Sequence, residues 1–379
     1  MRPSGRARLS SLAAFVVAGS SACGASRDAK GPSTDDAGAD AHALYEGGRS
    51  PEASRHADSA GPEAGGTPDP SSPGPYTFAE LDDTIATVTG SPDTSLAVHC
   101  AYPKTGPAAG PYPVVVVAHG FDLPPSEYYG YLQRLASFGY VALTVDFPSS
   151  FASPSDPANA ADLLAGLDWA KANATVGAIS NTMRSGMTGH SEGGKDALYA
   201  ATLDPRVKAS IVLDPVDAAG GMACTAPACV TVATLLPSLH IPTGFLGETT
   251  DSTGGLGGMP CAPAAESFVT FYAMTNSPSF AVTVTNADHM AFLDDVSTCG
   301  FVCSVCTAGT ATNATVSGIG HAYVAAFYER YLRGNLAYES YLTGADAKAR
   351  YVMTNEATIT SPRDSTTTCG TIQRSWAGP

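Results

Sequence analysis

The chain has 379 residues and a formal net charge of -15, with 35 acidic residues against 20 basic ones. This length allows one large domain with a substantial core, or two small ones. The excess of negative charge leaves no basic surface to neutralise phosphates, which argues against nucleic-acid binding and against polyanionic substrates.

Residues 1–23 predict an export signal. Three arginines precede the apolar run at 12–17, and small residues follow it. The run is too short to span a bilayer. Cys23 comes directly after the small residues, as at a bacterial lipoprotein processing site, although Ser20 stands where such sites usually carry Leu. We expect an exported protein, either lipid-anchored to the cell envelope through Cys23 or secreted after ordinary signal cleavage.

Residues 24–75 consist mostly of Ala, Gly, Ser, Asp and Pro, with almost no large apolar side chain. Such a segment cannot bury enough surface to offset the entropy of the chain. It predicts a disordered tether, which leaves residues 76–379 for the folded domain.

From Tyr76 onward, short β-rich runs alternate with helical stretches. This alternation is typical of an α/β protein, with a mostly parallel sheet and helices on both faces. The run at 114–118 has no polar residue, as expected of a strand buried on both sides. The first two strands are expected to be antiparallel. The predicted strands are 85–88, 95–101, 114–118, 141–147, 185–188, 209–213, 241–246 and 280–285, and the predicted helices are 126–138, 158–172, 193–202, 264–274 and 318–332.

Gly189 to Gly193 form a G-x-S-x-G motif between a predicted strand and a helix rich in small residues. In the α/β-hydrolase fold this motif makes a sharp turn that exposes a nucleophilic serine. The flanking glycines are needed because a side chain there would collide with the neighbouring strand or helix. The motif and its context therefore predict Ser191 as a nucleophile.

A serine hydroxyl is a weak nucleophile, so a histidine must take its proton and a carboxylate must orient that histidine. In this fold the three residues occur in the order Ser, acid, His. His289 follows the predicted strand 280–285, where a loop can bring it over Ser191. His321 lies inside the closing helix and His240 precedes a strand, so His289 is the predicted base.

Three carboxylates remain candidates for the acid. Asp214 follows the strand 209–213, at the sheet edge expected for Ser191. Glu248 and Asp251 follow the next strand, which is the other place where this fold carries its acid. Any of the three could also be a solvated loop carboxylate, the commonest environment of acidic side chains.

The reaction also needs N–H donors for the oxyanion of its tetrahedral intermediate. One is expected at Glu192, the residue after the nucleophile, and the other in the loop after the strand 114–118. We assign the second donor to Phe121, because Gly120 lets the backbone approach closely.

Cysteine usage agrees with export. Nine cysteines less Cys23 leave an even number, which predicts disulfides in an exported chain. Cys303 and Cys306 form a C-x-x-C close to Cys299, a spacing that also occurs in zinc sites. No second C-x-x-C or histidine pair lies nearby to complete four ligands, so disulfides are favoured, with a connectivity that the sequence does not define. The eight cysteines are Cys100, Cys224, Cys229, Cys261, Cys299, Cys303, Cys306 and Cys369.

Five ordered segments between residues 112 and 332 resemble chlorophyllases and related serine esterases of the dienelactone hydrolase and platelet-activating factor acetylhydrolase type. The resemblance implies a Ser-Asp-His triad with Asp214 as the acid, and ester cleavage without a metal or organic cofactor. Chlorophyllases typically carry Arg after the nucleophile where this chain has Glu192, so the reaction carries over but not chlorophyll as substrate. The segments are Gly120-Phe121 with Phe138-Gly139-Tyr140, Gly189-His190-Ser191 with Gly193-Gly194-Lys195, Leu213-Asp214-Pro215-Val216-Asp217, Pro260-Cys261-Ala262-Pro263, and Asp288-His289-Met290 with Phe292-Leu293-Asp294-Asp295.

The sequence therefore predicts a carboxylic ester hydrolase that acts through an acyl-enzyme at Ser191, on a small-molecule or lipid-like ester. Two other functions stay open at this point. One is acyl transfer to an alcohol or amine by the same triad, and the other is a non-catalytic surface binding protein that kept the fold.

Overall fold

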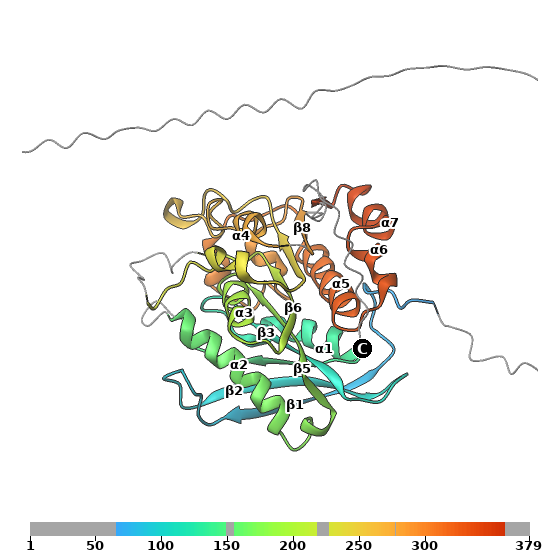
Figure 1. The fold of residues 1–379 in the computed structure, drawn as a ribbon. Helices are drawn as coiled ribbons and strands as arrows, with labels where there is room; N and C mark the ends of the chain where they lie inside the picture. Colours follow the sequence, from blue (N-terminus) through green and yellow to red (C-terminus); the bar gives the residue numbers. More distant parts are fainter. Residues whose placement is uncertain (1–65, 149–154, 218–226, 277, 361–379) are drawn as a thin grey trace, which may run out of the picture. The chain divides into compact units, whose positions relative to one another are not determined.

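The computed structural model describes residues 66–148, 155–217, 227–276 and 278–360 (Figure 1). The predicted export signal, Cys23 and most of the predicted tether lie outside these residues. Within them, no helix is both long and apolar enough to cross a membrane. Residues 66–75, which the sequence placed in the tether, contact the domain: Arg350 forms an ion pair with Asp69 at 2.7 Å, and the Gly74 N–H donates to Ser137 Oγ at 2.9 Å. The folded part therefore begins before Tyr76.

A nine-stranded sheet forms the centre of the described domain, in the order β1-β2-β4-β3-β5-β6-β7-β8-β9. The strands from β4 to β8 in this order are parallel, whereas β1, β2 and β9 pair antiparallel at the two edges. The predicted α/β-hydrolase architecture is confirmed. The strands are β1 (Thr77–Ile85), β2 (Leu96–Thr105), β3 (Tyr112–Ala118), β4 (Val141–Val145), β5 (Ser180–His190), β6 (Val207–Leu213), β7 (Thr243–Gly247), β8 (Ser279–Val284) and β9 (Ala357–Thr360).

Helices cover both faces of this sheet (Figure 1). α1 and α5 pack on one face, and α2, α3 and α4 pack on the other. The helices are α1 (Tyr129–Ser137), α2 (Asp156–Ala172), α3 (Glu192–Leu203), α4 (Phe268–Met274), α5 (Asn313–Tyr331), α6 (Glu339–Leu342) and α7 (Ala345–Ala347).

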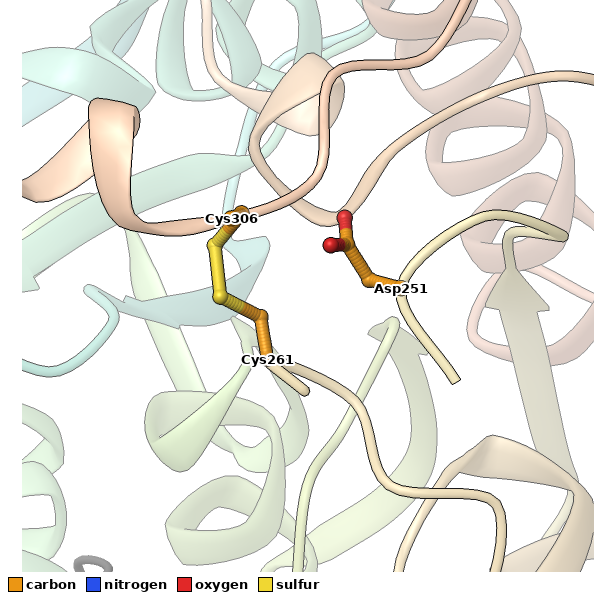
Figure 2. Close-up of side chains that lie close together, drawn as sticks. All are labelled: Asp251, Cys261 and Cys306. Atoms are coloured by element: carbon orange, nitrogen blue, oxygen red, sulfur yellow. A yellow bond between two sulfur atoms is a disulfide. The ribbon is translucent and has the colours of Figure 1, made fainter. Parts of the chain in front are cut away.

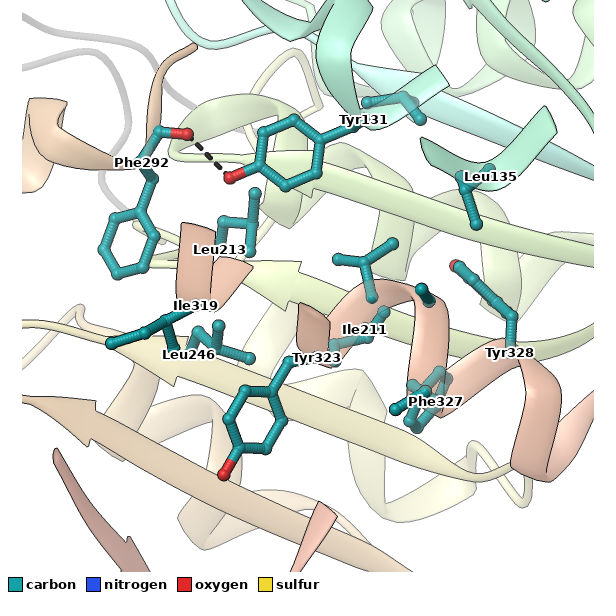
Figure 3. Packing of buried hydrophobic residues seen from close by; sticks show 14 of the residues in the cluster. Tyr131, Leu135, Ile211, Leu213, Leu246, Phe292, Ile319, Tyr323, Phe327 and Tyr328 are labelled. Carbon is teal, nitrogen blue, oxygen red and sulfur yellow. Dashed lines mark hydrogen bonds between the residues drawn. The ribbon is translucent and has the colours of Figure 1, made fainter. Parts of the chain in front are cut away.

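The burial of strand β3 shows that helices cover both faces of the sheet. All of its residues are buried, with Val115 and Val117 facing α1 and α5, and Val114 and Val116 facing α2 and α3. Each such valine contributes about 1.5–3 kcal/mol by leaving water. Figure 3 shows the core on the α5 side, where the Tyr131 hydroxyl donates to the Phe292 carbonyl at 2.7 Å.

Two strand predictions were wrong, both at the sheet edges. The strand expected at 85–88 runs instead from Thr77 to Ile85, and β9 was not predicted. β1 is mostly exposed, so its sequence carries charged residues in place of an apolar alternation. β9 has only four residues, too few to show a periodicity.

Candidate active site

Ser191 lies on the turn between β5 and α3. Its backbone has φ 57° and ψ -124°, a conformation that L-residues rarely adopt. The Ser191 N–H donates to the Leu213 carbonyl of β6 at 3.1 Å, which fixes the turn against the neighbouring strand. A Cβ at Gly189 would collide with the Gly193 carbonyl, and one at Gly193 with the His119 carbonyl. The two flanking glycines of the motif are therefore required by close backbone approach.

The structure brings together the three residues that the sequence proposed as a triad. His289 Nε2 lies 2.8 Å from Ser191 Oγ, and His289 Nδ1 lies 2.6 Å from Asp214 Oδ2. The three side chains follow the carboxyl ends of β5, β6 and β8. Asp214 is fully buried and His289 nearly so, whereas Ser191 is half-buried.

These contacts define the tautomer of His289. A carboxylate only accepts hydrogen bonds, so Nδ1 carries the proton and the lone pair of Nε2 faces the Ser191 hydroxyl. Burial lowers the pKa of His289, but the hydrogen bond and charge of Asp214 outweigh it, and the net pKa lies above the ordinary value. The site thus stabilises an imidazolium beside Ser191.

The other two acid candidates accept main-chain N–H groups, and only Asp251 accepts that of His289. Asp251 Oδ2 accepts the main-chain N–H of His289 at 2.7 Å, and its Oδ1 accepts that of Thr307 at 2.6 Å. Glu248 accepts the main-chain N–H groups of Thr250 and Asp251. Burial and the nearby Asp214 raise the pKa of Glu248 to about 7. Among the three candidates, Asp214 is the one hydrogen-bonded to the imidazole.

The two predicted oxyanion donors lie in the segments expected of them. Phe121 belongs to the loop after β3, and Glu192 is the first residue of α3. The Gly120 N–H donates to the Tyr128 hydroxyl at 3.1 Å, so that amide already has a partner within the protein.

The prediction of disulfides is confirmed. Cys261 pairs with Cys306, Cys299 pairs with Cys303, and Cys229 is also disulfide-bonded. Cys100, by contrast, is a free thiol buried in β2, so the eight cysteines do not all pair. Cys224 and Cys369 lie outside the described residues.

Figure 2 shows Asp251 beside the disulfide between Cys261 and Cys306. Among the described residues these three form the one group with metal-ligating atoms close together. Both sulfurs are joined to each other, however, and both carboxylate oxygens accept main-chain N–H groups. The group therefore links the loops around His289 and does not have the donor chemistry of a zinc site.

The Tyr128 hydroxyl and the His190 ring are hydrogen-bonded to each other next to His289, and the sequence analysis gave neither a role. The Tyr128 hydroxyl lies 2.8 Å from His190 Nδ1, and His190 Nε2 lies 2.9 Å from the His289 carbonyl. Tyr128 lies in the predicted helix 126–138, and His190 occupies a variable position of the G-x-S-x-G motif. A buried histidine next to the nucleophile was the available signal, because a buried ring must find partners for its nitrogens.

A cavity of about 500 Å³ lies between α2 and the segment that follows β1, lined by Ile85, Thr87 and Trp169 among others. Ser191, Asp214 and His289 do not line it.

A serine on a strand-to-helix turn, with a histidine and a carboxylate from later strand ends, defines a member of the α/β-hydrolase class. The chain matches the chlorophyllase family over residues 73–349, more than half of its length, and it belongs to that family.

Curated relatives match a smaller part of the chain. It is 30% identical to Chlorophyllase-1 of Arabidopsis thaliana over 198 residues, which cover 49% of this chain and 61% of the relative. It is 32% identical to bis(hydroxyethyl) terephthalate hydrolase of Streptomyces coelicolor over 142 residues, 38% of this chain and 44% of the relative. It is 33% identical to Lipase 1 of a Moraxella species over 114 residues, 30% of this chain and 35% of the relative. The chain thus spans less than two thirds of the length of these relatives.

Proposed function

We propose that this protein hydrolyses carboxylic esters through an acyl-enzyme at Ser191. The observation that carries the proposal is the unbroken pair of hydrogen bonds from Ser191 through His289 to Asp214. The names of the relatives support the same reaction, because a chlorophyllase, a terephthalate ester hydrolase and a lipase are all named for ester substrates.

In the first half-reaction, Ser191 Oγ bonds to the carbonyl carbon of the ester while its proton moves to His289 Nε2. The carbonyl oxygen becomes an oxyanion, held by the N–H groups of Phe121 and Glu192. The tetrahedral intermediate then expels the alcohol, which takes the proton from His289. Water deacylates Ser191 by the same steps and releases the acid.

The buried Asp214 has two tasks in this mechanism. It holds the proton of His289 on Nδ1, so that Nε2 can accept from Ser191, and it stabilises the imidazolium that forms. A buried carboxylate serves this purpose well, because no water competes for the interaction or screens it.

We propose uncharged esters as the substrate class. Glu192 follows the nucleophile directly, and the chain has a net charge of -15, so an ester that carries carboxylates would be repelled. Glu192 places a negative charge where chlorophyllases typically carry Arg, so chlorophyll is not the proposed substrate.

The test is hydrolysis of p-nitrophenyl esters of increasing chain length by the wild-type protein and by Ser191→Ala. We expect turnover by the wild type, loss of about 10³-fold or more in the variant, and labelling of Ser191 by a fluorophosphonate probe. Equal activity in both proteins would refute the mechanism. A wild type that neither turns over nor labels would indicate a binding protein, and esters formed with an added alcohol would indicate an acyltransferase.

A further inference from the structure

A continuous line of hydrogen bonds connects the loop after β3 with the main chain of His289. The Gly120 N–H of the β3 loop donates to the Tyr128 hydroxyl at 3.1 Å. That hydroxyl lies 2.8 Å from His190 Nδ1, and His190 Nε2 lies 2.9 Å from the main-chain carbonyl of His289. Tyr128 and His190 are both fully buried, so no solvent replaces these partners.

Only one assignment of donors and acceptors satisfies every hydrogen bond in this line. The His289 carbonyl can only accept, so His190 Nε2 carries the proton. In a neutral ring His190 Nδ1 is then an acceptor, and the Tyr128 hydroxyl must donate to it. That hydroxyl in turn accepts the Gly120 N–H, so every polar group in the line is satisfied.

We infer that Tyr128 and His190 are positioning residues for the reaction proposed above, on which this inference rests. We call the pair the Tyr128–His190 bridge. One end of the bridge fixes Gly120, the residue before the proposed oxyanion donor Phe121. The other end fixes the backbone of His289, and His190 itself precedes Ser191. The bridge therefore sets the oxyanion donor, the base and the nucleophile relative to one another.

The electrostatics of the two histidines agree with this assignment. The rings of His190 and His289 lie with centroids 4.6 Å apart. Burial, followed by the charge of His289, lowers the pKa of His190 well below its ordinary value. His190 therefore stays neutral when His289 takes the proton of Ser191, and its Nδ1 continues to accept from Tyr128 throughout the cycle.

Tyr128→Phe tests the bridge with minimal change of shape. It removes the acceptor of the Gly120 N–H and the donor to His190, and leaves the triad side chains intact. We expect kcat to fall by about 10- to 100-fold with KM changed less than about three-fold, because misplacement of reacting groups by about 1 Å can cost 100-fold in rate. Affinity for an alkyl boronic acid, which forms a tetrahedral adduct at Ser191, should fall in parallel with kcat/KM.

Two substitutions of His190 separate the ends of the bridge. His190→Asn keeps an acceptor near the position of Nδ1 and loses the donor to His289. His190→Gln keeps a donor near the position of Nε2 and loses the acceptor for Tyr128. Because Tyr128→Phe and His190→Gln break the same bond, we expect the double variant to lose little more activity than the more impaired single variant.

Tyr140→Phe is the matched control, since Tyr140 is also fully buried and its hydroxyl donates to Glu329 at 3.0 Å. It should lower the melting temperature but leave kcat unchanged per active site, as counted by fluorophosphonate titration. If the wild type is active and Tyr128→Phe retains its kcat and boronate affinity within two-fold, the inference about the bridge is overturned. Additive losses in the double variant would overturn it too. A wild type without ester turnover would instead overturn the proposed function.

Discussion

Replacing Asp214 by Asn tests which carboxylate serves as the acid of the proposed triad. The Asp214 to His289 contact is 2.6 Å and fully buried. Opposite unit charges about 4 Å apart attract by about 4 kcal/mol at an effective dielectric constant of about 20. Loss of this attraction in the transition state corresponds to about 10³-fold in rate. An Asn amide would also donate to Nδ1 and move the histidine proton to Nε2, so we expect a total loss of about 10⁴-fold in kcat.

The assay is kcat/KM for a p-nitrophenyl ester from about pH 5 to pH 10. The Asp214 carboxylate raises the pKa of His289. Because the proposed reaction requires neutral His289, wild-type activity should increase with pH, with a midpoint above the ordinary pKa of histidine. Without the carboxylate, the remaining activity of Asp214→Asn should rise at lower pH. Glu248→Gln is the comparison, because Glu248 does not contact the imidazole. Activity of Asp214→Asn within ten-fold of wild type, with a loss of about 10³-fold in Glu248→Gln or Asp251→Asn, would refute the assignment.

Two further predictions concern stability. Burial, with a smaller contribution from Asp93, raises the pKa of Asp162 from 3.8 to about 7. The folded state therefore loses stability as the pH rises from about 4 to about 7, by up to about 4 kcal/mol at 1.36 kcal/mol per pKa unit. Asp162→Asn should be more stable than wild type at pH 8 and similar near pH 4 in urea unfolding; a difference independent of pH would contradict this. Replacing both Cys261 and Cys306 by Ser opens a link across 45 residues and should cost roughly 4 kcal/mol. It should also lower kcat, since Thr307 would no longer be held against Asp251, and unchanged melting temperature and kcat would count against this role.

The parts of the fold that the sequence predicted well are those buried on both sides. β3 is an apolar run because helices cover both of its faces, and the G-x-S-x-G motif leaves few alternatives for the turn at Ser191. β1 and β9 were mislocated or missed because edge strands bury little and need no regular apolar pattern.

The residues of the candidate site also differ in how well the sequence predicted them. Ser191 and His289 could be predicted from the motif, the chain order and the strand ends. Asp214, Glu248 and Asp251 all follow strand ends, so position alone did not distinguish them, and only the family resemblance favoured Asp214. Distinguishing them requires knowing which oxygen meets an imidazole and which meets a main-chain N–H, and this depends on how a loop folds back over the sheet. The hydroxyl of Tyr128 was missed for the same reason, since helical periodicity describes which face is buried and not which polar atoms meet there.

His289 has four polar atoms, and all of them are engaged before any ester arrives. Its N–H bonds to Asp251, its carbonyl to His190, its Nδ1 to Asp214 and its Nε2 to Ser191. The proposed base is thus pre-assembled, and little reorganisation is left for the proposed reaction. In the proposed reaction, rearrangement of this histidine would therefore contribute little to discrimination between esters. For the proposed hydrolysis, selectivity would then come from the side chains that contact the acyl and alcohol groups of the ester.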